Sequence, residues 1–184
     1  MKQEIRDAKG LTEEEFLRQY DSSKYPKPSL TADIVIFRIH DDDRDPDVLF
    51  IRRKGHPFLG HLAFPGGFAE KGETIETTAA RELEEETGVT GLEMKLVGIY
   101  SRPGRDPRGW TVSAAYMTTV RDGEIKPVAG DDARDVCWAS VKMQGGGPVV
   151  SLDGECVNDE LAFDHYEILT DACKAAALQH HQAR

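Results

Sequence analysis

The stretch from Gly67 to Val89 reads GFAEKGETIETTAARELEEETGV, a glycine-rich turn followed by a segment crowded with glutamates. Thr74 is a favourable N-cap, and Gly88 suits the left-handed position just past a helix end, so the sequence predicts a helix over residues 75–87. At about 100° per residue, the small and apolar side chains of this helix share one arc. A second arc carries three carboxylates, those of Glu82, Glu85 and Glu86.

Three carboxylates on one helix face point to a metal site. At spacings i, i+3 and i+4 they repel one another if they only face water. A hard cation such as Mg²⁺ or Mn²⁺ reverses this repulsion, because it prefers oxygen ligands. A solvated acidic face is the alternative, and for three glutamates alone it is the commoner arrangement. The residues around the glutamates favour the metal site.

The whole stretch matches the pattern G-x5-E-x7-R-E-U-x-E-E-x-G-U, in which U is aliphatic. The matching residues are Gly67, Glu73, Arg81, Glu82, Leu83, Glu85, Glu86, Gly88 and Val89. A chance match in a chain of this size has a probability on the order of one in ten million. The chain therefore resembles the Nudix hydrolases, which cleave a nucleoside diphosphate linked to another group.

This resemblance implies an α/β (α+β) fold in which a mixed β-sheet is sandwiched between α-helices. It also implies roles for residues at matching positions. Arg81 is expected to orient Glu73, and both are counted with Glu85 in the catalytic group. The implied ligands of Mg²⁺, or of Mn²⁺, are the backbone carbonyl of Gly66 and the carboxylates of Glu82, Glu85 and Glu86.

Length and composition bound the organisation of the chain. Its 184 residues suit one globular domain, and we expect an N-terminal helical extension over 1–29, a hydrolase domain over 30–178 and a frayed tail over 179–184. A net charge of −10 argues against a nucleic-acid partner, which would need a basic surface. The sequence lacks an apolar leader and any run of 18 apolar residues, and its three cysteines have no C-x-x-C spacing. We therefore expect a cytoplasmic protein without a membrane partner.

Local signals place the first elements. Thr12 and Glu15 form a capping box, which predicts a short helix ending near Tyr20. The β-branched run at 30–39 and the run at 48–53 predict a hairpin across a polar turn.

Four arginines are candidates for binding substrate phosphates, because guanidinium groups bind phosphate oxygens in pairs. Arg52 and Arg53 end the second strand of the hairpin, and since strand neighbours face opposite ways, one of them is expected to point toward the cleft. Arg105 and Arg108 lie in the segment RPGRDPRGW. A solvated basic loop is the alternative for this segment.

Two further segments extend the resemblance. RDPRG, at residues 105–109, and LAFDH, at 161–165, are similar to motifs of the bacterial ADP-ribose pyrophosphatase subgroup. Asp164 and Glu167 predict another capping box at the start of the last helix, and His165 is expected to be structural. The segment AGDD, at residues 129–132, is an acidic loop before another short strand, and Nudix enzymes often take a base or an extra ligand from this region. Asp131 or Asp132 could serve here, and Asp132 is the candidate.

The function that this resemblance implies is Mg²⁺-dependent hydrolysis of the pyrophosphate of ADP-ribose to AMP and ribose 5-phosphate. The partner is then a small nucleoside-diphosphate substrate, and a homodimer is left open. A pyrophosphatase for nucleoside triphosphates or another nucleotide sugar is the alternative within the enzyme class. A non-catalytic ADP-ribose sensor is the alternative from another class.

Overall fold

The computed structural model describes residues 5–42, 44–130 and 133–182. The helical elements are α1 (Glu13–Gln19), η1 (Ser22–Lys24), α2 (Ile75–Thr87), η2 (Asn158–Glu160) and α3 (His165–Gln182). The strands are β1 (Ser29–Ile39), β2 (Asp47–Arg53), β3 (Leu62–Ala63), β4 (Gly66–Phe68), β5 (Lys95–Tyr100), β6 (Thr111–Arg121), β7 (Ala133–Gln144), β8 (Gly147–Leu152) and β9 (Glu155–Cys156).

The strands form one mixed sheet with the order β5-β6-β1-β2-β7-β8-β9. The short strands β3 and β4 pair with β2 and β1. The central pair β1 and β6 is parallel, whereas β1 and β2 form the predicted antiparallel hairpin. β1 is therefore an interior strand with β6 and β2 on its two sides, and it also pairs with the short strand β4.

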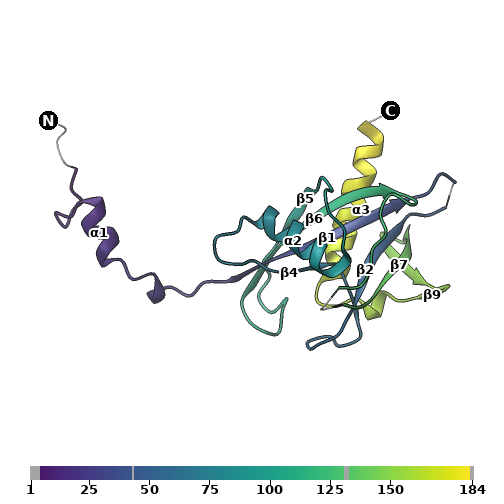
Figure 1. The fold of residues 1–184 in the computed structure, drawn as a ribbon, viewed down its shortest axis with the longest axis horizontal. Helices are drawn as coiled ribbons and strands as arrows, with labels where there is room; N and C mark the ends of the chain where they lie inside the picture. The colour runs from purple at the N-terminus through teal and green to yellow at the C-terminus, as the bar shows by residue number, and fades with distance from the viewer. Residues whose placement is uncertain (1–4, 43, 131–132, 183–184) are drawn as a thin grey trace.

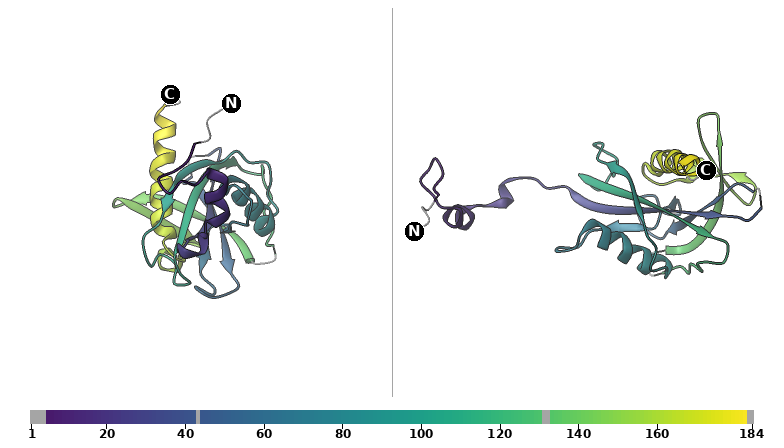
Figure 2. Two further views of the ribbon diagram at one scale, coloured as in Figure 1. Left: turned by 90° about the vertical axis from the view of Figure 1, so that its left-hand side faces the viewer. Right: turned by 90° about the horizontal axis from the view of Figure 1, so that it is seen from above.

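Two helices cover opposite faces of the sheet, as Figure 2 shows most clearly in its right-hand view. Alternate residues of β1 belong to two different cores, because successive side chains of a strand point to opposite faces. Ile34 and Ile36 pack in the same core as Leu83 of α2, while Val35 packs with Ile168 of α3. The predicted fold class, a mixed sheet between helices, is confirmed.

The N-terminal segment lies apart from the sheet and its two helices (Figure 1). α1 has the predicted capping box, with Thr12 accepting from the Glu15 N–H and the Glu15 side chain accepting from the Thr12 N–H. It has no buried residue. The expected division of the chain at residues 29 and 178 stays a prediction.

Within the described part of the chain, no helix is long and apolar enough to cross a membrane.

Candidate active site

The glutamate-rich helix α2 forms as its local sequence predicts. The Thr74 hydroxyl accepts a hydrogen bond from the Thr77 N–H, and Gly88 ends the helix in the left-handed conformation with φ 68°. Ala79 and Leu83 are buried against the sheet, which fixes the rotation of the helix about its axis. The carboxylates of Glu82 and Glu86 lie beside this packed face, and Glu86 is itself buried.

The glycines of β4 bring the backbone directly beneath these carboxylates. A Cβ at Gly66 would lie 2.1 Å from the Ala32 carbonyl oxygen of β1, so only glycine fits there. A Cβ at Gly67 would lie 2.4 Å from Oε2 of Glu82. The Gly66 N–H donates to Oε2 of Glu86 at 2.8 Å. The backbone of β4 thus contacts α2 through the carboxylates of Glu82 and Glu86.

Arg81 connects the acidic side chains of α2 with Glu73 and with the backbone of β4. Its Nε donates to Oε1 of Glu73 at 2.8 Å, and its Nη2 donates to Oε2 of Glu73 at 3.1 Å and to the Phe68 carbonyl at 2.9 Å. Nη1 donates to Glu82 at 2.7 Å and to Glu85 at 2.9 Å. The hydrogen bonds from Arg81, followed by that from the Glu70 N–H, lower the pKa of Glu73 to about 2. The implied pairing of Arg81 with Glu73 is therefore present.

The acidic side chains differ in how they face the cleft. Glu82 and Glu86 line it together with Gly66, whereas Glu85 lies outside the lining with 58% of its side chain exposed. Among the described residues, no group of three or more His, Cys, Asp or Glu side chains is arranged to hold a metal ion by itself. The donor set nevertheless fits a hard cation, because two carboxylates and a tight glycine backbone supply oxygen ligands on one wall of an open cleft.

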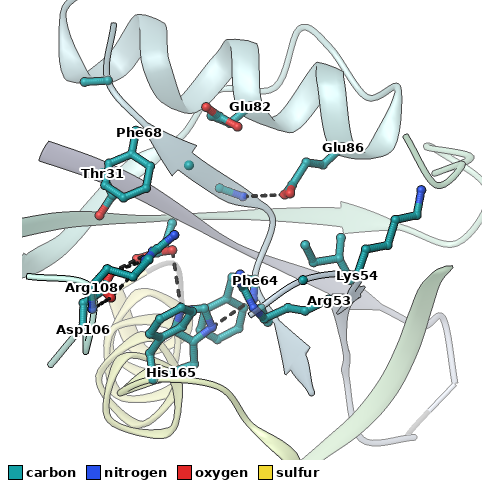
Figure 3. A pocket seen from close by; sticks show the side chains of 18 of the residues that line it. Thr31, Arg53, Lys54, Phe64, Phe68, Glu82, Glu86, Asp106, Arg108 and His165 are labelled. Carbon is teal, nitrogen blue, oxygen red and sulfur yellow. Dashed lines mark hydrogen bonds and ion pairs between the residues drawn. The ribbon is translucent and has the colours of Figure 1, made fainter. Parts of the chain in front are cut away.

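The cleft has a volume of about 560 Å³, and both acidic and basic side chains line it. Figure 3 shows Glu82 and Glu86 on one side, with Arg53 and Arg108 across from them. A site with this distribution of charge suits a ligand that carries both phosphates and a bound cation.

The two arginines of the RDPRG loop have different environments. Arg108 lines the cleft, forms a two-pronged pair with Asp106 and lies with its Cζ 4.7 Å from the ring centre of Phe68. Arg105 also borders the cleft, but only 4% of its side chain is exposed and it pairs with Asp164. The structure thus places Arg105 in a buried ion pair, whereas the sequence predicted a substrate clamp at both positions.

The predicted capping box at the start of α3 is wrong. The Asp164 carboxylate accepts from Nε and Nη2 of Arg105, at 2.8 and 2.6 Å. The Glu167 N–H instead donates to the Asp164 backbone carbonyl. The Arg105 guanidinium, which the tertiary fold places beside Asp164, binds the carboxylate that the local sequence assigned to the cap, because a two-pronged pair of opposite charges is stronger than one hydrogen bond from a backbone N–H.

Arg52 and Arg53 lie in different environments, and the pairing of β2 with β7 changes register between them. Arg53 lines the cleft, donates to the Pro57 carbonyl and lies 4.9 Å from the ring centre of Phe163. Arg52 lies outside the lining and donates to the Gly60 carbonyl at 2.7 Å. Burial lowers the pKa of Arg53, and the charge of Arg108 acts in the same direction.

A buried polar group at the floor of the cleft escaped the sequence reasoning. Asp33 of β1 accepts from the Ser113 hydroxyl and lies 3.5 Å from Nε2 of His165 and 3.8 Å from Nη2 of Arg105. Burial opposes its ionisation, but these three partners hold the pKa of Asp33 below its ordinary value. One feature of the sequence indicates this group: Asp33 is a single carboxylate within an apolar strand. Because a buried charge needs partners, such a position predicts polar side chains around it.

The proposed acidic-loop base, Asp132, and its alternative Asp131 lie outside the described residues. The residue before them, Gly130, donates its N–H to the Glu86 carbonyl at 3.0 Å. A Cβ at Gly130 would lie 1.7 Å from the Glu85 carbonyl oxygen. The chain therefore enters the acidic loop in contact with the end of α2.

Comparison with known proteins agrees with this geometry. The family description NUDIX domain matches residues 29–144. The chain belongs to the Nudix family. The Nudix chain is 36% identical over 166 residues to the ADP-ribose pyrophosphatase of Methanocaldococcus jannaschii, which covers 90% of this chain and 84% of that protein. The enzyme class predicted from the sequence, a Nudix hydrolase, is confirmed.

Solved Nudix structures have the same fold. A MutT/nudix family protein from Enterococcus faecalis superposes with a TM-score of 0.80 at 36% identity, over 91% of this chain and 70% of that one. The NUDIX domain of Shewanella oneidensis NrtR, complexed with ADP ribose, superposes with a TM-score of 0.70 at 28% identity, over 90% of this chain and 99% of that one.

Proposed function

We propose that this Nudix hydrolase cleaves the pyrophosphate bond of ADP-ribose, giving AMP and ribose 5-phosphate, with Mg²⁺ or Mn²⁺ as its cofactor. The observation that carries the proposal is the pairing of opposite charges across one cleft. Glu82 and Glu86 stand on one wall, and Arg53 and Arg108 stand on the other. A diphosphate bound with a divalent cation presents charges of both signs to match these walls.

The two arginines add a specific reason to expect an anion. Burial lowers the pKa of Arg53, and the neighbouring charge of Arg108 acts in the same direction, which means that the two guanidinium groups repel each other. A phosphate group between the guanidinium groups would relieve that repulsion. The substrate itself is supported by two relatives, the archaeal ADP-ribose pyrophosphatase and the NrtR domain complexed with ADP ribose.

In this proposal the cation is held by Glu82, Glu86 and the Gly66 carbonyl, with Glu85 as a further ligand at the rim. When bound, a divalent cation supplies charge neutralisation for the diphosphate and increases the acidity of a water nucleophile. The Gly66 N–H holds Glu86 in place, and Arg81 holds both Glu82 and Glu85.

The remaining steps belong to the side chains of the protein. Arg53 and Arg108 bind the phosphates and keep the diphosphate close to the carboxylate wall. Glu73 fixes Arg81 and thereby the orientation of the acidic helix. The proton of the attacking water goes to a carboxylate, for which Glu85 and Asp132 of the acidic loop are the candidates.

A substrate panel with product analysis tests the proposal. The panel contains ADP-ribose, NADH, diadenosine polyphosphates, ADP-glucose and nucleoside triphosphates, each assayed with Mg²⁺ and with excess EDTA. We expect ADP-ribose to give AMP and ribose 5-phosphate with the highest kcat/KM and no turnover in EDTA. Undiminished turnover in EDTA would exclude the cation requirement, and preference for a triphosphate would move the enzyme to the alternative substrate class.

A Glu86→Gln variant separates catalysis from binding. The amide is almost the same size as the carboxylate, so the fold should persist while kcat falls steeply. If the wild-type protein binds ADP-ribose in calorimetry but releases no AMP with any divalent cation, the chain is a sensor.

We also infer that it has no nucleic-acid partner, which a mobility-shift assay with duplex DNA would test.

A further inference from the structure

His165 joins the start of α3 to the turn at residues 64–66, which lies beside the carboxylates of α2. Only 3% of its side chain is exposed, and its Nδ1 lies 3.0 Å from the backbone N of Phe64. The two rings stack, with centres 4.8 Å apart and planes 15° from parallel. Because Nδ1 accepts the Phe64 N–H, it must carry a lone pair, and the ring proton therefore lies on Nε2.

Asp33 accounts for this tautomer. Its Oδ1 lies 3.5 Å from Nε2 of His165, and its other oxygen accepts from the Ser113 hydroxyl. A carboxylate on one side of an imidazole keeps the proton on the facing nitrogen and leaves the opposite nitrogen as an acceptor. The chain of contacts runs from Asp33 through His165 to the Phe64 N–H, and each member is buried.

The turn that receives this hydrogen bond also carries Gly66. Pro65 lies between Phe64 and Gly66 and has no N–H, so the turn offers one donor on each side of the proline. Phe64 donates to His165 of α3, and Gly66 donates to Glu86 of α2. The Pro65 carbonyl accepts from the Ile34 N–H of β1 at 2.9 Å. The turn is thus held from both helices and from the central strand.

We propose that His165 is a positioning residue for the cation site: by accepting the Phe64 N–H, it fixes the turn whose Gly66 carbonyl and Gly66 N–H serve the cation and Glu86. This inference rests on the proposed cation requirement, but it does not depend on which substrate is cleaved. It gives the LAFDH motif a role in preparing the metal-binding backbone. Figure 3 shows His165 and Phe64 on one side of the cleft and Glu86 on the other.

Two amide substitutions test the roles of the two ring nitrogens of His165 one at a time. In His165→Asn the side-chain oxygen can occupy the place of Nδ1, so the Phe64 N–H keeps an acceptor while the donor to Asp33 is lost. In His165→Gln the amide reaches the place of Nε2, so Asp33 keeps its donor while the Phe64 N–H loses its acceptor. The readout is Mn²⁺ affinity without substrate, measured from the electron paramagnetic resonance signal of free Mn²⁺.

We expect His165→Gln to weaken Mn²⁺ binding by about tenfold or more and His165→Asn to stay within about threefold of wild type, as for other residues that orient metal ligands. Equal affinities in all three proteins would overturn the proposal. Equal weakening in both variants would also overturn it, because the effect would then follow loss of the ring and not loss of the acceptor.

Asp33→Asn provides a second variant if His165→Gln does not fold. An amide that donates to Nε2 would drive the ring proton to Nδ1, and the Phe64 N–H would lose its acceptor, so Mn²⁺ binding should weaken. Nitrogen-15 spectra of histidine-labelled wild-type protein should show the neutral Nε2–H tautomer for His165, and an Nδ1–H tautomer or an imidazolium at neutral pH would overturn the proposal. Wild-type Mn²⁺ binding without hydrolysis of ADP-ribose would instead reject the proposed function alone.

Discussion

Arg105 and Asp164 form a buried, two-pronged ion pair that ties the RDPRG loop to the start of α3. Their side chains are 4% and 3% exposed, and both oxygens of the carboxylate are used. Burial opposes the charge of Arg105, but the Asp164 carboxylate raises its pKa above the ordinary value. Arg105 therefore holds the loop in place, and Arg108 is the arginine of the loop that presents a half-exposed guanidinium to the cleft.

Arg105→Met is expected to lower the free energy of unfolding by about 3–5 kcal/mol, because it leaves the Asp164 carboxylate buried without its partner. Urea unfolding at pH 7 measures this change. The double variant Arg105→Met with Asp164→Leu should recover much of the loss, since it removes both charges. A double variant no more stable than the single one would show that the pair is not the source of the effect.

Arg108→Lys is expected to reduce kcat/KM for ADP-ribose by roughly ten- to a hundredfold, because lysine keeps the charge but loses the fork that binds phosphate oxygens in pairs. The melting temperature should change little. Arg102→Lys is the matched control, since Arg102 belongs to the same loop but lies outside the cleft and pairs with Glu167. Equal kinetics in both variants would remove Arg108 from the binding site.

Glu73→Gln is expected to change the acid profile of stability. The folded pKa of Glu73 is about 2, against an ordinary value of 4.5. A carboxylate with a depressed pKa stabilises the fold fully above its unfolded pKa, and this contribution is lost as pH falls through the folded value. The stability difference between wild type and variant should therefore be greatest above pH 4.5 and should shrink toward pH 2. Chemical denaturation across this range measures it, and a difference independent of pH would contradict the Arg81 pairing.

Alanine at the two glycines of β4 should have two different effects. Gly66→Ala places a Cβ 2.1 Å from a backbone carbonyl of β1, so we expect a stability loss of about 1–3 kcal/mol or more. Gly67→Ala meets the carboxylate of Glu82 and not the backbone, so a change of side-chain rotamer can relieve the contact, and stability should hold while Mn²⁺ affinity falls. Thermal unfolding and Mn²⁺ titration measure the two quantities, and unchanged Mn²⁺ affinity in Gly67→Ala would argue against Glu82 as a ligand.

The sequence by itself determined those features whose causes lie within a few residues. Thr74 and Gly88 bound α2 because each cap is completed by the adjacent turn of the helix. The hairpin of β1 and β2 follows from two β-prone runs across a short polar turn, and the pair of Arg81 with Glu73 was implied by the motif. That Arg53 lines the cleft and Arg52 does not agrees with the expectation from strand geometry that one of the two faces the cleft.

Tertiary structure alone decided which polar groups meet beneath the cleft. Arg105 reaches Asp164 across 59 residues, Ser113 reaches Asp33 across 80, and Phe64 reaches His165 across 101. Read locally, Asp164 is a helix cap and Arg105 an exposed cation, and both interpretations are reasonable until α3 docks against the loop. Docking removes water from these groups together, and a buried charge or N–H must then take whichever partner the packing of the sheet and helices brings within reach.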